Sequence, residues 1–233
     1  MVAGYSAAQV RAAEAPHLAA GVPHMQRAAS ALADALRRVL ADAGSPHGPA
    51  VLLVGSGDNG GDALFAGAEL AREGVDVTAV GTSERMHSDG RRAAFDAGVR
   101  FVAWGDAEAA GAAFESAAVL VDGILGTGTG TGTGTSNSPA LRGTARDLVA
   151  AAIPIVRTRA TPVVAVDLPS GIHPDDGSVP DPTVLRATLT VTFGAVKAGL
   201  LRRPAADYAG RVELVDLGLG DELATMTPLV VTD

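Results

Sequence analysis

Four side chains with hard oxygen donors stand where short apolar runs of the chain end. Asn59, Asp122 and Asp167 each follow such a run, and Ser170 comes three residues after Asp167. Amide, carboxylate and hydroxyl oxygens suit an alkali or alkaline-earth cation rather than zinc. A single carboxylate among neutral ligands favours a monovalent ion, which predicts a site made by Asn59, Asp122 and Ser170. The alternative is that Asp122 and Asp167 only form turns.

The segment 55–62 reads Gly-Ser-Gly-Asp-Asn-Gly-Gly-Asp and directly follows the apolar run 51–54. It satisfies the Gly-x-Gly-x-x-Gly pattern that brings backbone N–H groups to a phosphate at the start of a helix. An ordinary dinucleotide site would also place an acid at the end of the next strand, and none stands there. Asp58 and Asp62 inside the segment either contact a cation or sugar hydroxyls, or cap the helix.

Two further segments follow predicted strands. Five Gly-Thr pairs run from Gly126 to Thr135, a composition that predicts a mobile loop. From Gly130 onward this loop is either part of a site or a tolerated surface insertion. Lys197 follows the run 187–192, and it either faces a pocket and attracts phosphate or lies solvated at the surface.

The composition limits the class of protein. The chain has 233 residues, no cysteine and a formal net charge of −8. The negative charge argues against a nucleic-acid partner, and the absence of thiols excludes disulfides and zinc–thiolate sites. Because no apolar run is long enough to cross a bilayer, we expect no membrane partner and a cytoplasmic location.

The order of elements predicts an α/β fold with a Rossmann-like, doubly wound, mostly parallel sheet and two N-terminal helices. We expect one domain over residues 1–233, with the N-terminal helices in 1–45 and the α/β core in 50–220. In such sheets ligands bind outside the carboxyl ends of the strands. The predicted helices are 6–18, 24–43, 61–73, 89–97 and 139–152, and the predicted strands are 51–54, 75–80, 99–102, 117–121, 162–166, 187–192 and 211–215.

Four motifs in this order resemble the YjeF N-terminal domain family, the NAD(P)H-hydrate epimerases. That family shows Gly-x-Gly-Asn-Asn-Gly-Gly-Asp-Gly, which corresponds to residues 55–63, with Asp58 and Ala63 as departures. Its Asp-(x)₃-Gly-Thr-Gly matches 122–128, its Asp-x-Pro-Ser-Gly matches 167–171, and its Thr-Phe-Gly-x-x-Lys-x-Gly matches 192–199. The segment 9–14 also looks like the family, so the similarity spans nearly the whole chain.

The resemblance implies an isomerase that interconverts the R and S forms of hydrated NADH and NADPH (NADHX and NADPHX), and therefore a cofactor-repair enzyme. It implies one K⁺ per subunit at Asn59, Asp122 and Ser170, and Asp167 as the catalytic residue. The substrate-binding residues that it implies are Asp58, Asn59, Gly60, Gly61, Asp62, Gly126, Thr127, Gly128, Thr129, Gly130, Thr131, Gly132 and Asp167.

The route of the reaction stays open at this point. Either the hydroxyl beside the ring nitrogen is lost and water returns from the other face, with Asp167 moving the proton, or the ring opens. The rival interpretation is a non-catalytic nucleotide-binding or dimerising scaffold of the same fold. By analogy with the family we expect a homodimer, and an ADP- or ATP-dependent dehydratase that is fused or separate.

Overall fold

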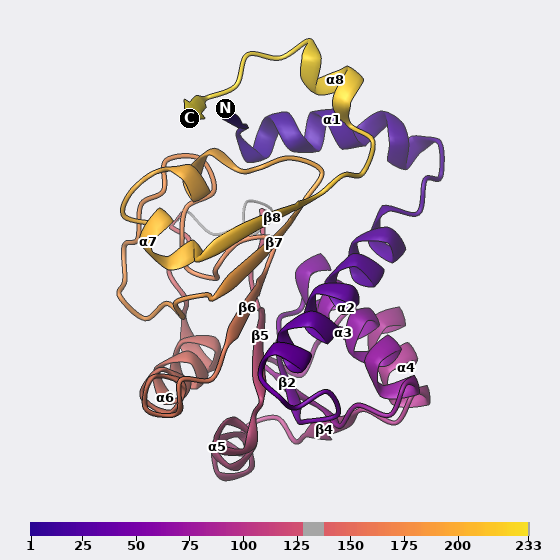
Figure 1. Cartoon of the computed structure of the whole chain (residues 1–233), viewed down its shortest axis with the longest axis vertical. Helices are drawn as coiled ribbons and strands as arrows, with labels where there is room; N and C mark the ends of the chain where they lie inside the picture. The colour runs from indigo at the N-terminus through magenta and orange to yellow at the C-terminus, as the bar shows by residue number, and fades with distance from the viewer. Residues whose placement is uncertain (128–137, 233) are drawn as a thin grey trace.

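A seven-stranded parallel sheet forms the centre of the protein in the computed structural model, which describes residues 1–127 and 138–232. The strand order is β4-β3-β2-β5-β6-β7-β8 (Figure 1). Strands β3 and β4 are therefore added in sequence on one side of β2, and β5 to β8 are added in sequence on the other side. The strands are β2 (Ala50–Val54), β3 (Val77–Gly81), β4 (Arg100–Val102), β5 (Val119–Gly123), β6 (Val163–Val166), β7 (Leu189–Phe193) and β8 (Arg211–Val215).

Helices cover both faces of this sheet, as the apolar strand sequences require. In β2, Leu52 packs into one hydrophobic cluster with α2, α3 and α4, whereas Leu53 packs into another with α5 and α6. Successive side chains of a strand point to opposite faces, so a fully apolar strand needs both layers. The helices are α2 (His24–Asp42), α3 (Asp58–Arg72), α4 (Ser88–Asp96), α5 (Ala107–Ser116) and α6 (Gly143–Arg159), and Figure 1 shows the two groups on either side of the sheet.

The two ends of the chain meet beside the carboxyl edge of the sheet. Strand β1 (Val2–Gly4) pairs antiparallel with β9 (Val230–Thr232), and α1 (Ala7–Ala19) lies against α8 (Gly220–Ala224) (Figure 1). Ser6 begins α1 with a capping box, since its hydroxyl accepts from the backbone N–H of Gln9. The short elements η1 (Ala198–Leu201) and α7 (Ala206–Ala209) complete the chain.

The predicted fold class, the parallel sheet and the two N-terminal helices are confirmed, with several differences in detail. Helix α3 begins at Asp58 rather than at residue 61, so most of the predicted glycine loop is the first part of a helix. Helix α5 was not predicted, because its alanine-rich sequence has little amphipathic pattern. Helix α6 runs on to Arg159, although Pro154 lies inside it.

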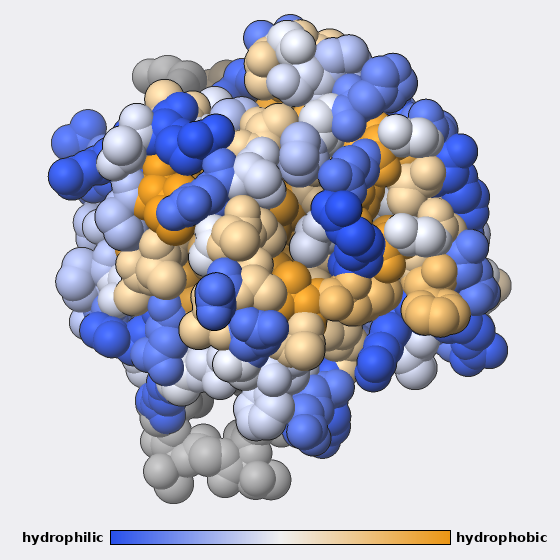
Figure 2. Space-filling model, turned by 90° about the horizontal axis from the view of Figure 1, so that it is seen from below, coloured by the Kyte–Doolittle hydropathy of each residue, from blue (hydrophilic) through white to orange (hydrophobic). Residues whose placement is uncertain are grey.

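The surface opposite α1 mixes charged and apolar side chains (Figure 2). Apolar residues form a nearly continuous area across the middle of this face, and hydrophilic residues surround and partly cover it (Figure 2). Most hydrophobic side chains lie instead in the two clusters against the sheet. Within residues 1–127 and 138–232, no helix is long and apolar enough to cross a membrane.

Close backbone contacts at the end of β2 require two glycines. A Cβ atom on Gly60 would lie 2.1 Å from the carbonyl oxygen of Gly55, and one on Gly55 would lie 1.9 Å from that of Ile124. No side chain fits at these distances, so the two glycines allow α3 and the segment after β5 to approach the end of β2.

We predict that Gly60→Ala lowers the free energy of unfolding by at least ~1–3 kcal/mol, because the backbone must move to admit the methyl group. Gly57→Ala is the matched control, since a Cβ atom there meets nothing within 4 Å. The control should change the free energy by less than about 1 kcal/mol. Denaturant unfolding measures both, and equal losses in the two variants would contradict this account.

Candidate functional site

The predicted site residues lie where the chain reverses direction across the sheet, between the carboxyl ends of β2 and β5. Doubly wound folds bind ligands in the crevice at this switch point. Asn59 lies in the first turn of α3 after β2, Asp122 lies near the end of β5, and Asp167 and Ser170 follow β6. Because β2, β5 and β6 are neighbours in the sheet, these residues meet at one edge.

Asp122 and Ser170 are in direct contact and almost fully buried. The Ser170 hydroxyl donates to Asp122 Oδ1 at 2.6 Å, and the Ser170 backbone N–H donates to Asp122 Oδ2 at 2.8 Å. The Leu125 N–H donates to the Ser170 hydroxyl at 2.9 Å. Asp122 therefore organises the segments after β5 and β6 and does more than form a turn.

Asn59 joins the same group from α3. Its side-chain amide donates to the Val166 carbonyl at 2.6 Å, which ties α3 to the end of β6. Its amide oxygen faces Gly126, where an added Cβ atom would lie only 2.2 Å away. The structure thus brings Asn59, Asp122 and Ser170 to one place, as the sequence predicted.

The donor set at this place fits a monovalent cation. Burial raises the pKa of the Asp122 carboxyl, and the hydrogen bonds from Ser170 oppose that rise. No cationic side chain is among the groups that shift the pKa of Asp122, so a bound cation would be the counterion of its ionised form. The neighbouring donors are neutral oxygens, from the Ser170 hydroxyl and the Asn59 amide. One negative charge among neutral oxygens is a suitable environment for an alkali cation.

Asp167 is held by the side chain that follows β7. The Lys197 ammonium donates to Asp167 Oδ1, to the Phe193 carbonyl at 2.8 Å and to the Thr192 hydroxyl at 3.3 Å. Lys197 is only 2% exposed, so it is not solvated at the surface. Its charge is paired with Asp167, so a role in attracting phosphate is not confirmed either. Asp167 has a left-handed backbone with φ of 68°, a strained conformation that aims its side chain toward β7.

Asp58 and Asp62 lie one helical turn apart on α3 but in different environments. Asp58 is exposed in the first turn, whereas Asp62 is 7% exposed. Gly57 takes the N-cap position of α3 without a side-chain hydrogen bond, so neither aspartate caps the helix. Burial raises the pKa of Asp62 well above its ordinary value of 3.8, and the nearby charges of Asp167 and Asp58 raise it further.

Helix α1 forms a wall of the site that was not predicted. Burial raises the pKa of Glu14, and this carboxyl interacts with the charges of Lys197 and Asp167. Arg11 donates to the Thr127 carbonyl at 2.9 Å and so reaches the segment after β5. The similarity of residues 9–14 to the family motif was the one sequence signal for this contact.

Of the remaining predicted binding residues, Gly60 and Gly61 lie buried in the first turns of α3, and Gly126 and Thr127 follow β5. Gly128, Thr129, Gly130, Thr131 and Gly132 lie outside the described residues, as does the rest of the Gly-Thr segment to Thr135.

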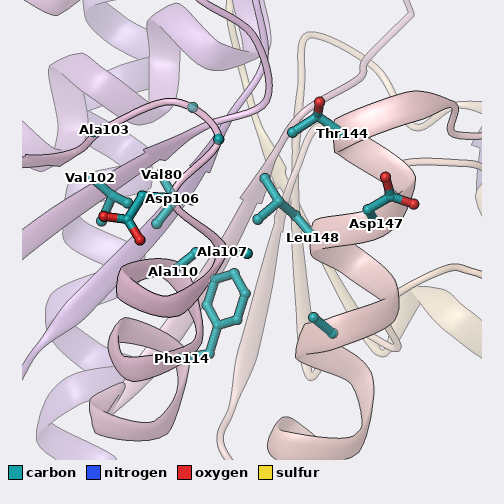
Figure 3. A pocket seen from close by; sticks show the side chains of 13 residues that line it. Val80, Val102, Ala103, Asp106, Ala107, Ala110, Phe114, Thr144, Asp147 and Leu148 are labelled. Atoms are coloured by element: carbon teal, nitrogen blue, oxygen red, sulfur yellow. The ribbon is translucent and has the colours of Figure 1, made fainter.

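A cavity of about 250 Å³ lies on the other helical layer, between α5 and α6 (Figure 3). Phe114 and Leu148 line it, and Asp106 and Asp147 stand beside it. Asp106 accepts the Ala109 N–H at 2.9 Å and so caps α5. None of the predicted site residues lines this cavity, so it is separate from the residues gathered at the switch point.

The fold and the site together define a doubly wound α/β protein with a group of buried polar side chains at its switch point. Comparison with protein families agrees, because the model described as YjeF-related protein N-terminus matches residues 23–199. An NAD(P)H-hydrate epimerase of Clavibacter michiganensis subsp. michiganensis is 51% identical over 97% of this chain and 94% of that protein. The chain belongs to the YjeF N-terminal family.

Two other relatives place the chain within this family. The bifunctional NAD(P)H-hydrate repair enzyme Nnr of Mycobacterium tuberculosis is 42% identical over 92% of this chain, but the match covers 41% of that longer protein. The crystal structure of yeast ynu0 has a TM-score of 0.70 at 19% identity and covers 85% of this chain and 82% of that one. The yeast structure therefore shares the fold.

We predict that Lys197→Met lowers the free energy of unfolding by about 3–5 kcal/mol, because it leaves the Asp167 carboxylate buried without a counterion. The double variant Lys197→Met/Asp167→Asn should lose clearly less, since no buried charge remains. Denaturant unfolding of the wild type, of Lys197→Met, of Asp167→Asn and of the double variant measures this coupling. A double variant as unstable as the sum of both single variants would contradict it.

Proposed function

We propose that this protein is an isomerase that interconverts the R and S forms of NADHX and NADPHX, in the repair of damaged nicotinamide cofactors. The observation that carries this function is the 51% identity to an NAD(P)H-hydrate epimerase over nearly the full length of both chains. A second epimerase, from Microbacterium testaceum, is 46% identical over 98% of this chain and 84% of that protein. A non-catalytic scaffold would not need the buried polar groups gathered at the switch point.

The substrate lies along the start of α3 and the segment after β5. Backbone N–H groups at the start of a helix suit the phosphates of the dinucleotide. Asp58, Asn59, Gly60, Gly61 and Asp62 occupy that position, and Gly126, in the segment after β5 with Thr127, lies against the Asn59 side chain. The part of the proposed contact that involves Gly128 to Gly132 rests on the family resemblance.

Asp167 is the proposed catalytic residue, and its surroundings support a role as carboxylate. Lys197, the Thr192 hydroxyl and the Phe193 N–H all donate to Oδ1. Oδ2 accepts no hydrogen bond from the described residues and is therefore the atom available to the substrate. Asn59, Asp122 and Ser170 would hold K⁺, which would supply a positive charge to the site.

The remaining proposals concern partners and location. Because one relative is a bifunctional repair enzyme, an ADP- or ATP-dependent dehydratase is the partner that consumes one epimer, whether separate or fused. A homodimer and a cytoplasmic location rest on the family resemblance alone.

The direct test supplies the hydrate epimer that a dehydratase cannot use, together with that dehydratase, and follows the recovery of NADH or NADPH by absorbance. We expect recovery well above the spontaneous rate when this protein is present. Asp167→Asn should reduce the rate by about 10²–10⁴-fold, the usual contribution of a general acid or base. Recovery at the spontaneous rate with folded wild-type protein would favour the scaffold instead.

We predict that KCl raises the melting temperature of the wild type more than NaCl at the same concentration, because a bound ion stabilises the folded state. Asp122→Asn removes the one charged ligand and should abolish this difference. The same salts should change the epimerisation rate in the same order. Equal melting temperatures in both salts would contradict a selective site at Asn59, Asp122 and Ser170.

A further inference from the structure

The cavity between α5 and α6 lies at the carboxyl edge of the sheet, on the other side of β2 from Asp167. Val80 and Gly81 at the end of β3 line it, and so does Val102 at the end of β4. The strand order places β3 and β4 on one side of β2, and β5 and β6 on the other. The cavity and Asp167 therefore flank the start of α3, which follows β2.

The spacing of the strands fits a ligand that reaches from one side to the other. Val54 at the end of β2 pairs with Gly81 of β3, and Val80 pairs with Val102 of β4. The N–H and the hydroxyl of Thr82 both donate to the Val54 carbonyl, at 2.9 and 3.1 Å. Because neighbouring strands lie about 4.8 Å apart, β3 is about 5 Å from β2 and about 14 Å from β6. An extended dinucleotide can span that distance with its phosphates over β2.

The size of the cavity suits one ring system. Its volume is about 250 Å³. Pockets that enclose a whole drug-sized ligand usually have about 300–1,000 Å³, so this one has room for part of a dinucleotide only. Val102, Ala107 and Leu148 give it apolar walls, and the almost fully buried Phe114 closes it on the side of the core (Figure 3).

The charged side chains that line the cavity are acidic. Asp106 and Asp147 line it and are exposed, and no lysine or arginine among the described residues does so. Asp106 accepts the Ala109 N–H at Oδ1, and its Oδ2 makes no hydrogen bond with the described residues. A carboxylate accepts hydrogen bonds from hydroxyl and amino groups and repels phosphate. The cavity therefore fits a part of a ligand that carries donors and no phosphate.

An exposed indole stands in the same loop. Trp104 is the only tryptophan of the chain, and it is 53% exposed. It lies between Ala103 and Gly105, and both of these residues line the cavity. An indole can stack on any base, because every base has a π-face. The loop thus offers a stacking surface together with the Asp106 carboxylate.

We propose that this cavity binds the adenine and the adjoining ribose of the substrate, so that the dinucleotide lies across the carboxyl edge of the sheet. This placement rests on the proposed function, which puts the nicotinamide end at Asp167 and the phosphates at the start of α3. The adenosine end is the remaining part, and it carries an amino group and ribose hydroxyls. Dinucleotide-binding folds hold that ribose at the end of the strand after the phosphate loop, which is β3 here. Asp106 serves in place of the acid that such sites usually have there.

The lining also sets a preference between the two hydrates. NADPHX has a phosphate on the adenosine ribose, and the Asp106 and Asp147 carboxylates would repel it. We expect a lower KM for NADHX than for NADPHX, and a smaller difference in Asp106→Asn. Asparagine is as good an N-cap as aspartate, so this variant should fold like the wild type. An unchanged ratio of the two KM values in Asp106→Asn would contradict the role of Asp106.

Filling the cavity tests the site directly in the dehydratase-coupled assay. Ala151 lines the cavity from α6 and is exposed, so a phenylalanine there takes up the space without displacing the core. Ala151→Phe should raise the KM for NADHX by about 5–150-fold, the usual contribution of one stacked base, with a smaller change in kcat.

Ala150→Phe is the matched control. Ala150 is the preceding residue of α6 and is also exposed, but it does not line the cavity. This variant should leave the KM within about twofold of the wild type, as surface substitutions usually do. Equal KM values in the two phenylalanine variants would overturn the proposed site.

A second measurement does not depend on activity. AMP contains the adenosine end, and its binding should change the fluorescence of Trp104, the only tryptophan. The affinity for AMP should fall in Ala151→Phe and stay unchanged in Ala150→Phe. Nicotinamide mononucleotide, the other half of the dinucleotide, should bind the wild type and both variants alike. AMP that binds both variants with equal affinity would show that adenosine lies elsewhere.

The outcomes separate this site from the proposed function. A wild type that binds AMP but does not exceed the spontaneous epimerisation rate contradicts the proposed function. An active wild type whose KM and affinity for AMP are unchanged by Ala151→Phe contradicts the adenosine site alone.

Discussion

The buried pair of Asp167 and Lys197 is the interaction on which the chemistry of this site depends. It joins the residue after β6 to the one before η1, and it compensates a carboxylate that could not otherwise stay charged in the interior. The pair also holds Asp167 at a left-handed φ of 68°, which a non-glycine residue adopts at a cost of order 1–3 kcal/mol. Because the ammonium occupies Oδ1, the free oxygen of the carboxylate is left for a ligand.

This pair matters only because neighbouring strand ends come close together. Gly55, Gly60 and Gly126 stand where any side chain would collide with backbone or with Asn59. Because these glycines have no Cβ atom, α3 and the segments after β5 and β6 can pack close together around Asp122 and Ser170. The hydrogen bonds between Asp122 and Ser170 then fix the β5 and β6 ends together.

Much of this site follows from the sequence, because strand ends can be located by apolar runs. Asn59, Asp122 and Ser170 were placed correctly for that reason, since parallel strands must end at one edge. Glu14 and Lys197 were not, because their positions depend on contacts between distant segments. Asp62 was placed at the start of the predicted helix 61–73, but its burial was not predicted, because the face of α3 that turns inward depends on packing against the sheet.

The same reasoning explains why the chain can tolerate Asp58 where the family has asparagine. Asp58 is exposed, so water and salt screen its charge from the phosphates that we place at the start of α3. The Asp58 charge acts more strongly on Asp62, which is buried one turn further along the helix. Less water lies between these two carboxyls, so the effective dielectric constant is lower. A negative charge at Asp58 therefore costs little in phosphate binding, and it adds to the rise in the pKa of Asp62 that burial causes first.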